Sequence, residues 1–361
     1  MKIAQVCHRY YPNIGGVETH VMKISERLAK NHDVKVISAD LSSEKSRNEE
    51  IEGVRIKRFR SISPNDAYFI APQIYFYLKK SDFDLIHAHN YHSIPALFAS
   101  LVKDTKFLFT PHYHGMGSTP LRDNLNKPYR LLGSRIFDRA NKIICVSDYE
   151  KDLVIKSFGI GDTDVVVIPN GVDIDEISKA KPFEFDGDLI LYVGRLDKYK
   201  NIHLAIKAME FLSDSYFYII GNGNYKMELD ELINRLNLGE RVKILSNVSD
   251  EEKYRWMKTC SLFINLSGIE AFGMTVIEAL AAEKAVIVNE RGGLKELAEK
   301  FDGVSPTNVE ETSVEKLARM IEEKMGERVK IDLSKYDWGN VAKRIEDVYL
   351  GVLGGDEYGD R

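Results

Sequence analysis

Short runs of apolar residues alternate with segments of helical periodicity along almost the whole chain. Val17, Val21, Ile24 and Leu28 recur at the spacing of one helix face, which predicts a helix after the first strand. The apolar runs lack the alternation of a half-exposed strand, so we expect parallel strands covered on both faces. The first part of the chain therefore predicts a doubly wound α/β domain. Its expected strands are residues 3–7, 34–38, 54–59, 84–87, 106–110, 142–146 and 165–168, with helices at 94–102 and 148–158 among others.

The pattern relaxes after the last of these strands, and then the same alternation begins again. We expect a first domain over residues 1–170, an interdomain linker at 171–187 and a second doubly wound domain over 188–337. A terminal amphipathic helix is expected at 338–353. The second domain has expected strands at 188–193, 216–220, 242–245, 261–265 and 285–288, separated by helices.

Composition narrows the class of protein. The 361 residues are 44% hydrophobic and 29% charged, which is typical of a globular protein with two domains. The net charge of −5 argues against a surface built for nucleic acid, and no apolar run reaches the ~18–20 residues of a membrane span. The start of the chain does not resemble a signal peptide, and Cys7, Cys145 and Cys260 are too far apart for a disulfide framework. These features predict a cytoplasmic protein.

Glycine and charge occur where strands should lead into helices. Gly15 and Gly16 stand before the first helix, where paired glycines allow a ligand close to the backbone or simply form a turn. Gly194, Arg195 and Lys200 follow the first strand of the second domain. Two cations beside a helix start are suited to a diphosphate without a metal, although a solvated charged loop has the same composition.

Two glutamates with seven residues between them form the most informative cluster. Glu270 follows an expected strand, and Glu278 lies one turn inside the next helix. A carboxylate in that place can accept hydrogen bonds from two ribose hydroxyls, while the free N–H groups at the helix start face phosphate or sugar oxygens. The alternative for Glu278 is an ordinary helix residue. Its apolar successors, residues 279–282, favour a buried carboxylate that has a partner.

Histidines concentrate in the first domain. His87, His89 and His92 follow one expected strand, and His112 and His114 follow the next. Histidines in this arrangement can ligate zinc, so a metal-dependent hydrolase has to be considered. No Asp or Cys set completes such a site, and imidazole at a strand end can equally bind a ligand or a backbone carbonyl. We therefore expect no metal site.

A basic run in the first domain has helical spacing. A helix of this kind could touch anionic lipid, which predicts a peripheral membrane contact; the alternative is a surface helix whose apolar stripe packs on the core. The basic residues are Arg122, Lys127, Arg130, Arg135 and Arg139, with Tyr129, Leu132, Ile136 and Ala140 between them.

Glu270 and Glu278 with Phe272 and Gly273 between them resemble the EX7E signature of retaining GT-B glycosyltransferases, family 4 (glycosyl transferases group 1) in particular. Other segments agree with this resemblance in the same order along the chain. They are Gly15 to Glu18, Val146-Ser147 with Glu150, Ile168 to Asp173, Gly194 to Lys200, Gly221-Asn222-Gly223 and Gly292-Gly293 with Glu296.

The resemblance implies a GT-B fold, in which two doubly wound Rossmann-like domains face across a cleft and the terminal helix crosses back to the acceptor-side first domain. It implies that Arg195 and Lys200 bind the donor diphosphate, that Glu278 holds the ribose and that Glu270 holds the transferred sugar. His112 would lie near the anomeric centre. The implied donor-binding set is Gly15, Gly16, Gly194, Arg195, Lys200, Asn222, Glu270, Phe272, Gly273, Met274, Thr275 and Glu278, and the catalytic set is Arg195, Lys200, Glu270 and His112. Asn201 departs from the family pattern, which has glycine there in many members.

The expected activity is transfer of a sugar from a UDP- or GDP-sugar to a hydroxyl of a glycan, lipid or small molecule, with retention and without a cofactor or essential metal. Such a hexosyltransferase would act in glycan biosynthesis in the cytoplasm or at the inner face of the membrane. A nucleotide-sugar epimerase or a sugar phosphorylase on the same fold is the alternative enzyme class. A nucleotide-sugar binding module without activity is a third interpretation that the intact glutamate pair disfavours.

Overall fold

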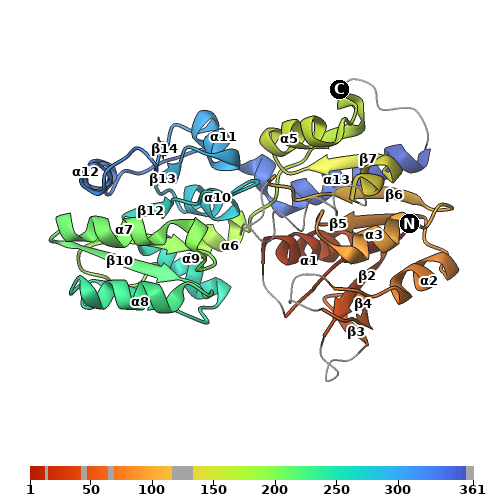
Figure 1. The fold of residues 1–361 in the computed structure, drawn as a ribbon, viewed down its shortest axis with the longest axis horizontal. Helices are drawn as coiled ribbons and strands as arrows, with labels where there is room; N and C mark the ends of the chain where they lie inside the picture. The colour runs from red at the N-terminus through yellow and green to blue at the C-terminus, as the bar shows by residue number, and fades with distance from the viewer. Residues whose placement is uncertain (13–14, 42–46, 64–68, 116–132, 355–361) are drawn as a thin grey trace. The chain divides into compact units, whose positions relative to one another are not determined.

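The computed structural model describes residues 1–12, 15–41, 47–63, 69–115 and 133–354. The chain divides into two compact units. The first consists of Met1–Gly171 together with Trp338–Arg361, and the second is Val172–Asp337. Each unit is built on one mostly or fully parallel sheet with helices packed on it, so the expected fold class of two Rossmann-like α/β domains is confirmed (Figure 1).

The first unit contains an eight-stranded sheet in the order β3-β4-β2-β1-β5-β6-β7-β8. All neighbouring strands are parallel except β3, which runs antiparallel to β4 at the edge. The strands are β1 (Lys2–Cys7), β2 (Asp33–Asp40), β3 (Asn48–Ile51), β4 (Val54–Arg60), β5 (Leu85–His89), β6 (Lys106–Thr110), β7 (Lys142–Cys145) and β8 (Val165–Val167). Its helices include α1 (Gly16–Leu28), α2 (Gln73–Lys80), α3 (Ile94–Ser100), α5 (Asp148–Phe158) and α13 (Trp338–Gly354).

The terminal helix α13 packs within the first unit, mainly on helix α1. Its Trp338 is buried against Gly171, where a Cβ would lie 2.4 Å from the indole ring. The Tyr349 hydroxyl accepts a hydrogen bond of 2.9 Å from Gln5 Nε2 in the central strand β1. Gly171 and the buried Tyr349 thus allow helix α13 to pack against the sheet of the first unit.

The second unit contains a six-stranded, fully parallel sheet in the order β11-β10-β9-β12-β13-β14. Helix α7 contacts both α8 and α12, and α6 contacts α9 and α10 as a second group. The strands are β9 (Asp188–Val193), β10 (Ser215–Ile220), β11 (Val242–Leu245), β12 (Leu262–Asn265), β13 (Val286–Asn289) and β14 (Val304–Thr307). The helices are α6 (Ile174–Lys179), α7 (Ile202–Ala208), α8 (Lys226–Arg235), α9 (Asp250–Thr259), α10 (Met274–Ala281), α11 (Gly292–Lys300) and α12 (Val314–Lys324).

The strand order places a topological switch point in each sheet. In the first unit β1 lies between β2 and β5, and in the second unit β9 lies between β10 and β12. Ligands of open α/β sheets bind outside the carboxyl ends of the strands at such points. The loops that follow β1, β5, β9 and β12 are therefore where functional residues are expected.

The boundary between the predicted linker and the second domain differs from the structure. Residues 172–187 belong to the second unit and include helix α6, which contacts α9 and α10. Ile177 in this helix is fully buried. A six-residue helix with one buried side chain leaves no periodic pattern long enough to recognise, which explains the difference.

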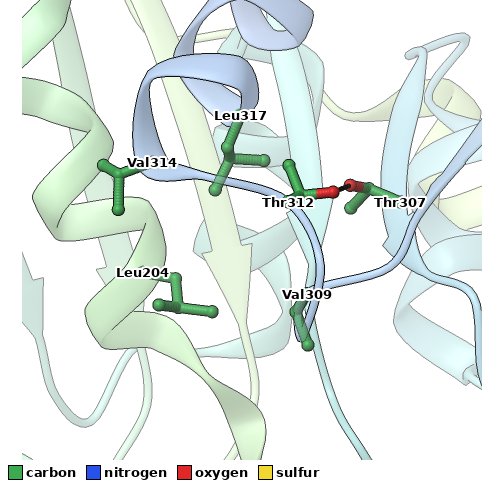
Figure 2. A pocket seen from close by; sticks show the side chains of 6 residues that line it. All are labelled: Leu204, Thr307, Val309, Thr312, Val314 and Leu317. Carbon is green, nitrogen blue, oxygen red and sulfur yellow. Dashed lines mark hydrogen bonds between the residues drawn. The ribbon is translucent and has the colours of Figure 1, made fainter.

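A small pocket in the second unit lies between helix α7, the end of β14 and the start of α12 (Figure 2). Its volume of about 10 Å³ has room for a single water molecule, and none of the predicted site residues lines it. The lining residues are Leu204, Thr307, Val309, Thr312, Val314 and Leu317. The pocket is too small for a nucleotide and does not mark the candidate site.

Among the described residues, no helix has the length and apolar character needed to cross a membrane. Of the predicted lipid-facing basic run, Arg122, Lys127 and Arg130 lie outside the described residues. Arg135 is exposed, whereas the Arg139 guanidinium donates to the carbonyl oxygens of Val102 (2.9 Å), Lys103 and Thr105. Arg139 therefore ties its helix to the neighbouring loop.

Candidate functional site

Gly194 and Gly221 shape the loop where the central strand β9 of the second unit ends. The Gly194 amide donates to the carbonyl oxygen of Ile220 (3.0 Å), so this loop stays joined to the end of β10. At Gly221 a Cβ would lie 1.9 Å from the Gly194 carbonyl oxygen, so only glycine fits there. The carbonyl oxygen of Asn222 accepts from the Leu196 amide (2.9 Å). Gly194, Arg195 and Asn222 are thus held together, as the predicted site requires.

Arg195 is the more exposed of the two predicted cations. Its side chain is 63% exposed and lies 3.2 Å from Asp197. It also donates to the Tyr199 hydroxyl at 2.6 Å. Both partners come from the same loop, so the guanidinium can turn toward a ligand without breaking the packing of the sheet.

Lys200 is buried and forms an ion pair with Glu270. Burial alone would lower the pKa of Lys200, but Glu270 and Tyr199 together outweigh burial and the net pKa is raised. Asn201 follows in a left-handed conformation with φ of 56° and donates to the Leu266 carbonyl oxygen (2.9 Å). Asparagine tolerates this region, so the departure from glycine leaves the loop geometry intact.

Helix α10 begins shortly after the first glutamate of the motif. Gly273 precedes the helix with φ of 103°, a conformation that favours glycine, and no side chain caps the helix start. The backbone N–H groups of Met274 and Thr275 therefore belong to the unsatisfied first turn, where partial positive charge favours anions. Phe272 is buried, and the Glu270 carbonyl oxygen accepts from the Gly293 amide (2.9 Å), which fixes the loop.

Glu278 is the buried carboxylate of this cluster. Lys253 Nζ from helix α9 donates to its Oε1 at 3.0 Å and also lies 2.9 Å from Asp250. Its Oε2 has no hydrogen-bond partner among the described residues. Burial raises the pKa of Glu278, and the Lys253 charge opposes that shift. One carboxylate oxygen is thus paired, and the other is buried and available.

The first unit holds the remaining predicted residues, Gly15, Gly16 and His112. A Cβ on Gly15 would lie 2.5 Å from Glu18 Oε2, whereas a Cβ on Gly16 would meet no atom within 4 Å. Packing within the unit therefore favours glycine only at position 15, and the predicted ligand contact of both glycines stays a prediction. His112 follows β6 with φ of 47°, and its Nε2 is buried without a partner in the described part of the chain.

The sequence motifs did not identify Lys253 or His20. Lys253 stands in a run of charged residues on helix α9, and only the fold brings it to Glu278. His20 occupies a fully buried position of helix α1. For His20 a signal existed, because it lies three residues after Val17 and four before Ile24, on the apolar face of the predicted helix.

Two family models match consecutive parts of the chain. Residues 14–176 match "Glycosyltransferase Family 4", and residues 173–336 match "Glycosyl transferases group 1". Together with the two Rossmann-like sheets and the motif residues at the second switch point, these matches show that the chain belongs to the glycosyltransferases of the GT-B fold.

Individual relatives agree with this class. The chain is 28% identical to an uncharacterized glycosyltransferase of Methanocaldococcus jannaschii over 94% of this chain and 95% of the relative. It is 27% identical to one component of the human phosphatidylinositol N-acetylglucosaminyltransferase, over 96% of this chain and 75% of that protein.

Solved structures with the same fold include two that align almost completely. Sucrose-phosphate synthase from Thermosynechococcus elongatus aligns with a TM-score of 0.81 at 17% identity, covering 98% of this chain and 99% of that one. Anabaena HepE in complex with UDP and glucose aligns with a TM-score of 0.77 at 20% identity, covering 97% of this chain and 100% of that one.

Proposed function

We propose that the protein is a retaining, family 4 type enzyme that moves a sugar from a nucleotide-diphosphate donor to an acceptor hydroxyl. The observation that carries this proposal is the buried Glu278, whose Oε1 is paired with Lys253 while Oε2 has no partner within the described residues. An unsatisfied buried acceptor costs about 1–3 kcal/mol. The vicinal hydroxyls of a ribose would satisfy it, as the family resemblance implies.

The donor diphosphate would lie at the loop after β9 and the start of helix α10. Arg195 and Lys200 supply positive charge there, and the backbone N–H groups of Met274 and Thr275 supply hydrogen-bond donors. Charge that develops on the leaving diphosphate is stabilised by such preorganised groups. We propose on this basis that the diphosphate needs no divalent cation.

The transfer breaks the bond between the anomeric carbon and the diphosphate oxygen. A new bond forms from the acceptor oxygen to the same face of the anomeric carbon, and the acceptor proton passes to the departing phosphate oxygen. Glu270, now paired with Lys200, would accept hydrogen bonds from hydroxyls of the transferred sugar. The positive charges and hydrogen-bond donors of the second unit thus stabilise the leaving diphosphate, and no covalent intermediate is required.

A uridine nucleotide is the first donor to test, because HepE was crystallised with UDP-glucose and the human relative is named for N-acetylglucosamine transfer. The name of that relative also supports a lipid-linked acceptor. Cys7, Cys145 and Cys260 are buried free thiols, which fits a reducing cytoplasm, where we propose that the enzyme acts.

The test compares UDP with 2′-deoxy-UDP in binding calorimetry. Glu278→Gln is expected to weaken UDP binding about 10-fold or more, as loss of a hydrogen bond to a charged group does, and to abolish the preference for UDP over its deoxy analogue. Glu231→Gln, an exposed residue of helix α8, is the matched control and should bind like the wild type. An unchanged preference in Glu278→Gln would refute the ribose assignment.

Two further measurements separate the alternatives. Incubation of the donor sugar without an acceptor should leave it unchanged, whereas appearance of an epimer would identify an epimerase. Release of a sugar phosphate when inorganic phosphate attacks a glycoside would instead identify a phosphorylase. UDP affinity in EDTA should equal that in Mg²⁺ if the diphosphate is held by protein cations alone.

A further inference from the structure

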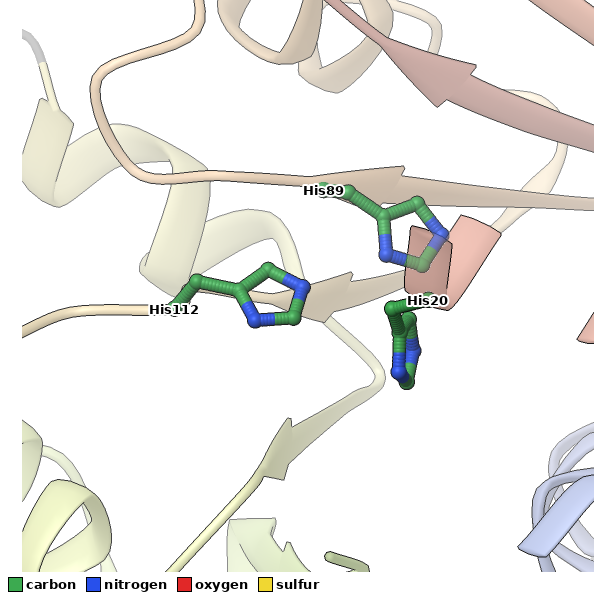
Figure 3. Close-up of side chains that lie close together, drawn as sticks. All are labelled: His20, His89 and His112. Carbon is green, nitrogen blue, oxygen red and sulfur yellow. The ribbon is translucent and has the colours of Figure 1, made fainter. Parts of the chain in front are cut away.

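Three histidines of the first unit converge at the carboxyl edge of its sheet, near the switch point. His20 comes from helix α1, His89 ends strand β5 and His112 follows strand β6 (Figure 3). Each offers one ring nitrogen, and these three nitrogens lie within 4.8 Å of one another. Because β5 and β6 are adjacent and parallel, their ends bring two of the imidazoles to the same side.

Ring nitrogens of this cluster lack hydrogen-bond partners. Nδ1 of His89 and Nε2 of His112 are buried and unpaired among the residues that the structure describes, and the buried ring of His20 interacts with the Asn170 side chain, which leaves at least one of its two nitrogens unpaired. The neighbouring His87 differs, because its Nδ1 lies 2.6 Å from the Tyr349 hydroxyl and its Nε2 lies 2.8 Å from the Thr110 hydroxyl. The cluster therefore has unused ligating capacity, which buried polar groups rarely keep.

Hydrogen bonding selects the ligating tautomer of His89. Its Nε2 lies 2.7 Å from Gln5 Oε1, while Gln5 Nε2 donates to the Tyr349 hydroxyl. The amide oxygen can only accept, so His89 Nε2 carries the proton and Nδ1 presents a lone pair toward His20 and His112. A carbonyl oxygen that orients the distal N–H of a ligand histidine is a recurrent feature of metal sites.

We propose that His20, His89 and His112 form a binding site for a divalent cation of borderline softness, with Zn²⁺ or Co²⁺ as the best match. Three imidazole nitrogens and one open position, filled by water, make a tetrahedral site. In such a site the nitrogens lie ~3.4 Å apart, so they need to approach by at most ~1.4 Å, which side-chain rotation supplies.

The bound cation joins helix α1 to the ends of β5 and β6. The site uses residues of the first unit alone, so it stands independently of the donor chemistry proposed for the second unit.

The experiment titrates Co²⁺ into the full chain without a histidine tag, after removal of metals by chelation. One equivalent should bind with the visible absorption of a tetrahedral site, and Zn²⁺ should displace it. His20→Gln, His89→Gln and His112→Gln should each weaken Co²⁺ binding at least ~10-fold. His87→Gln, whose nitrogens are already bonded, and His203→Gln in the second unit are the controls and should bind normally.

The wild-type titration decides the proposal even where a buried substitution unfolds the first unit. Absence of saturable tetrahedral Co²⁺ absorption would overturn the inference. Equal Co²⁺ affinity in the three ligand variants, each checked for folding by circular dichroism, would overturn it as well. A rise in the melting temperature of the wild type with Zn²⁺, lost in folded His89→Gln, would support it.

Discussion

Replacing Lys253 with methionine removes the cation that pairs with buried Glu278 while keeping most of the side-chain volume. The Glu278 side chain is 7% exposed and that of Lys253 is 17% exposed, so the pair is shielded from water. Removing one partner of a buried pair costs about 3–5 kcal/mol. Because Lys253 retains some exposure, we expect a loss near the lower end, about 3 kcal/mol, in the free energy of unfolding of the second unit.

The loss should depend on pH in a defined direction. In the variant nothing opposes the burial that raises the pKa of Glu278, so the folded-state pKa lies further above the unfolded value. The folded protein then binds more protons than the unfolded chain between those two values, and stability falls as pH rises through that window. The variant should be nearest to the wild type below about pH 4 and furthest from it at alkaline pH.

The two tryptophans allow the second unit to be followed by itself. Trp256 lies in helix α9 of the second unit, and Trp338 lies in the first. In a Trp338→Phe background, fluorescence during urea unfolding therefore reports the second unit alone. Unfolding curves at mildly acidic and at alkaline pH give the free energies to be compared.

Lys226→Met is the matched control. Lys226 pairs with Asp230 at 2.7 Å on the surface of helix α8, where both side chains are partly exposed. Exposed pairs of this kind contribute about 0.3–0.5 kcal/mol. If Lys253→Met cost no more than this control at alkaline pH, or if its loss did not grow with pH, the buried pair would not stabilise the second unit as argued. Addition of Glu278→Gln to Lys253→Met should recover part of the loss.

Three further predictions address single residues. Lys200→Ala should lower the turnover number about 100-fold through loss of leaving-group stabilisation, and steady-state rates that differ by less than about 3-fold would contradict its role. Burial raises the pKa of Glu150 to about 8. The stability of the wild type should therefore fall relative to that of Glu150→Gln as pH rises from about 4.3 to 8, which thermal melts at several pH values can measure. Melting temperatures of the two proteins that change in parallel with pH would contradict this prediction. Gly221→Ala forces a Cβ against the Gly194 carbonyl and should cost about 2–3 kcal/mol in urea unfolding, whereas Gly239→Ala, with open space, should change stability little.

The sequence pattern predicts best where both faces of a strand are buried. Strand β6 occupies the residues expected for it, because its apolar run is continuous. Helix α5 also has its expected bounds, where Ser147 caps the start. Strand β3 was missed because it is a polar edge strand, and β14 because Pro306 interrupts it. Helix α12 was not predicted although Leu317 and Ile321 carry a helical stripe that could have revealed it.

The candidate site was predictable where its chemistry lies within one loop. Glu270 and Glu278 stand eight positions apart, so a local motif identifies both. The lysines that pair with these two glutamates are distant in sequence and come close to them only in the folded chain. Lys253 comes from the preceding helix, and Lys200 meets Glu270 across seventy positions of sequence. A linear motif names the carboxylates, but only tertiary structure shows which cation each one faces.

On the proposed function, the charges of the second unit explain how one site could bind a dianion and still fold without it. Lys200 is buried with Glu270, and Lys253 with Glu278, so each inner cation is neutralised before a donor arrives. Buried unpaired cations would be costly, and these pairs remove that cost. Arg195 is paired with Asp197 of its own loop but is 63% exposed, so on the proposed function it is the cation that attracts the diphosphate from solvent. On the proposed function, the diphosphate then draws Lys200 from Glu270, and the released carboxylate accepts the sugar hydroxyls. Binding of the donor and release of Glu270 from Lys200 are thereby coupled. Glu270→Gln should therefore change the affinity for the sugar nucleotide more than the affinity for the nucleotide without its sugar.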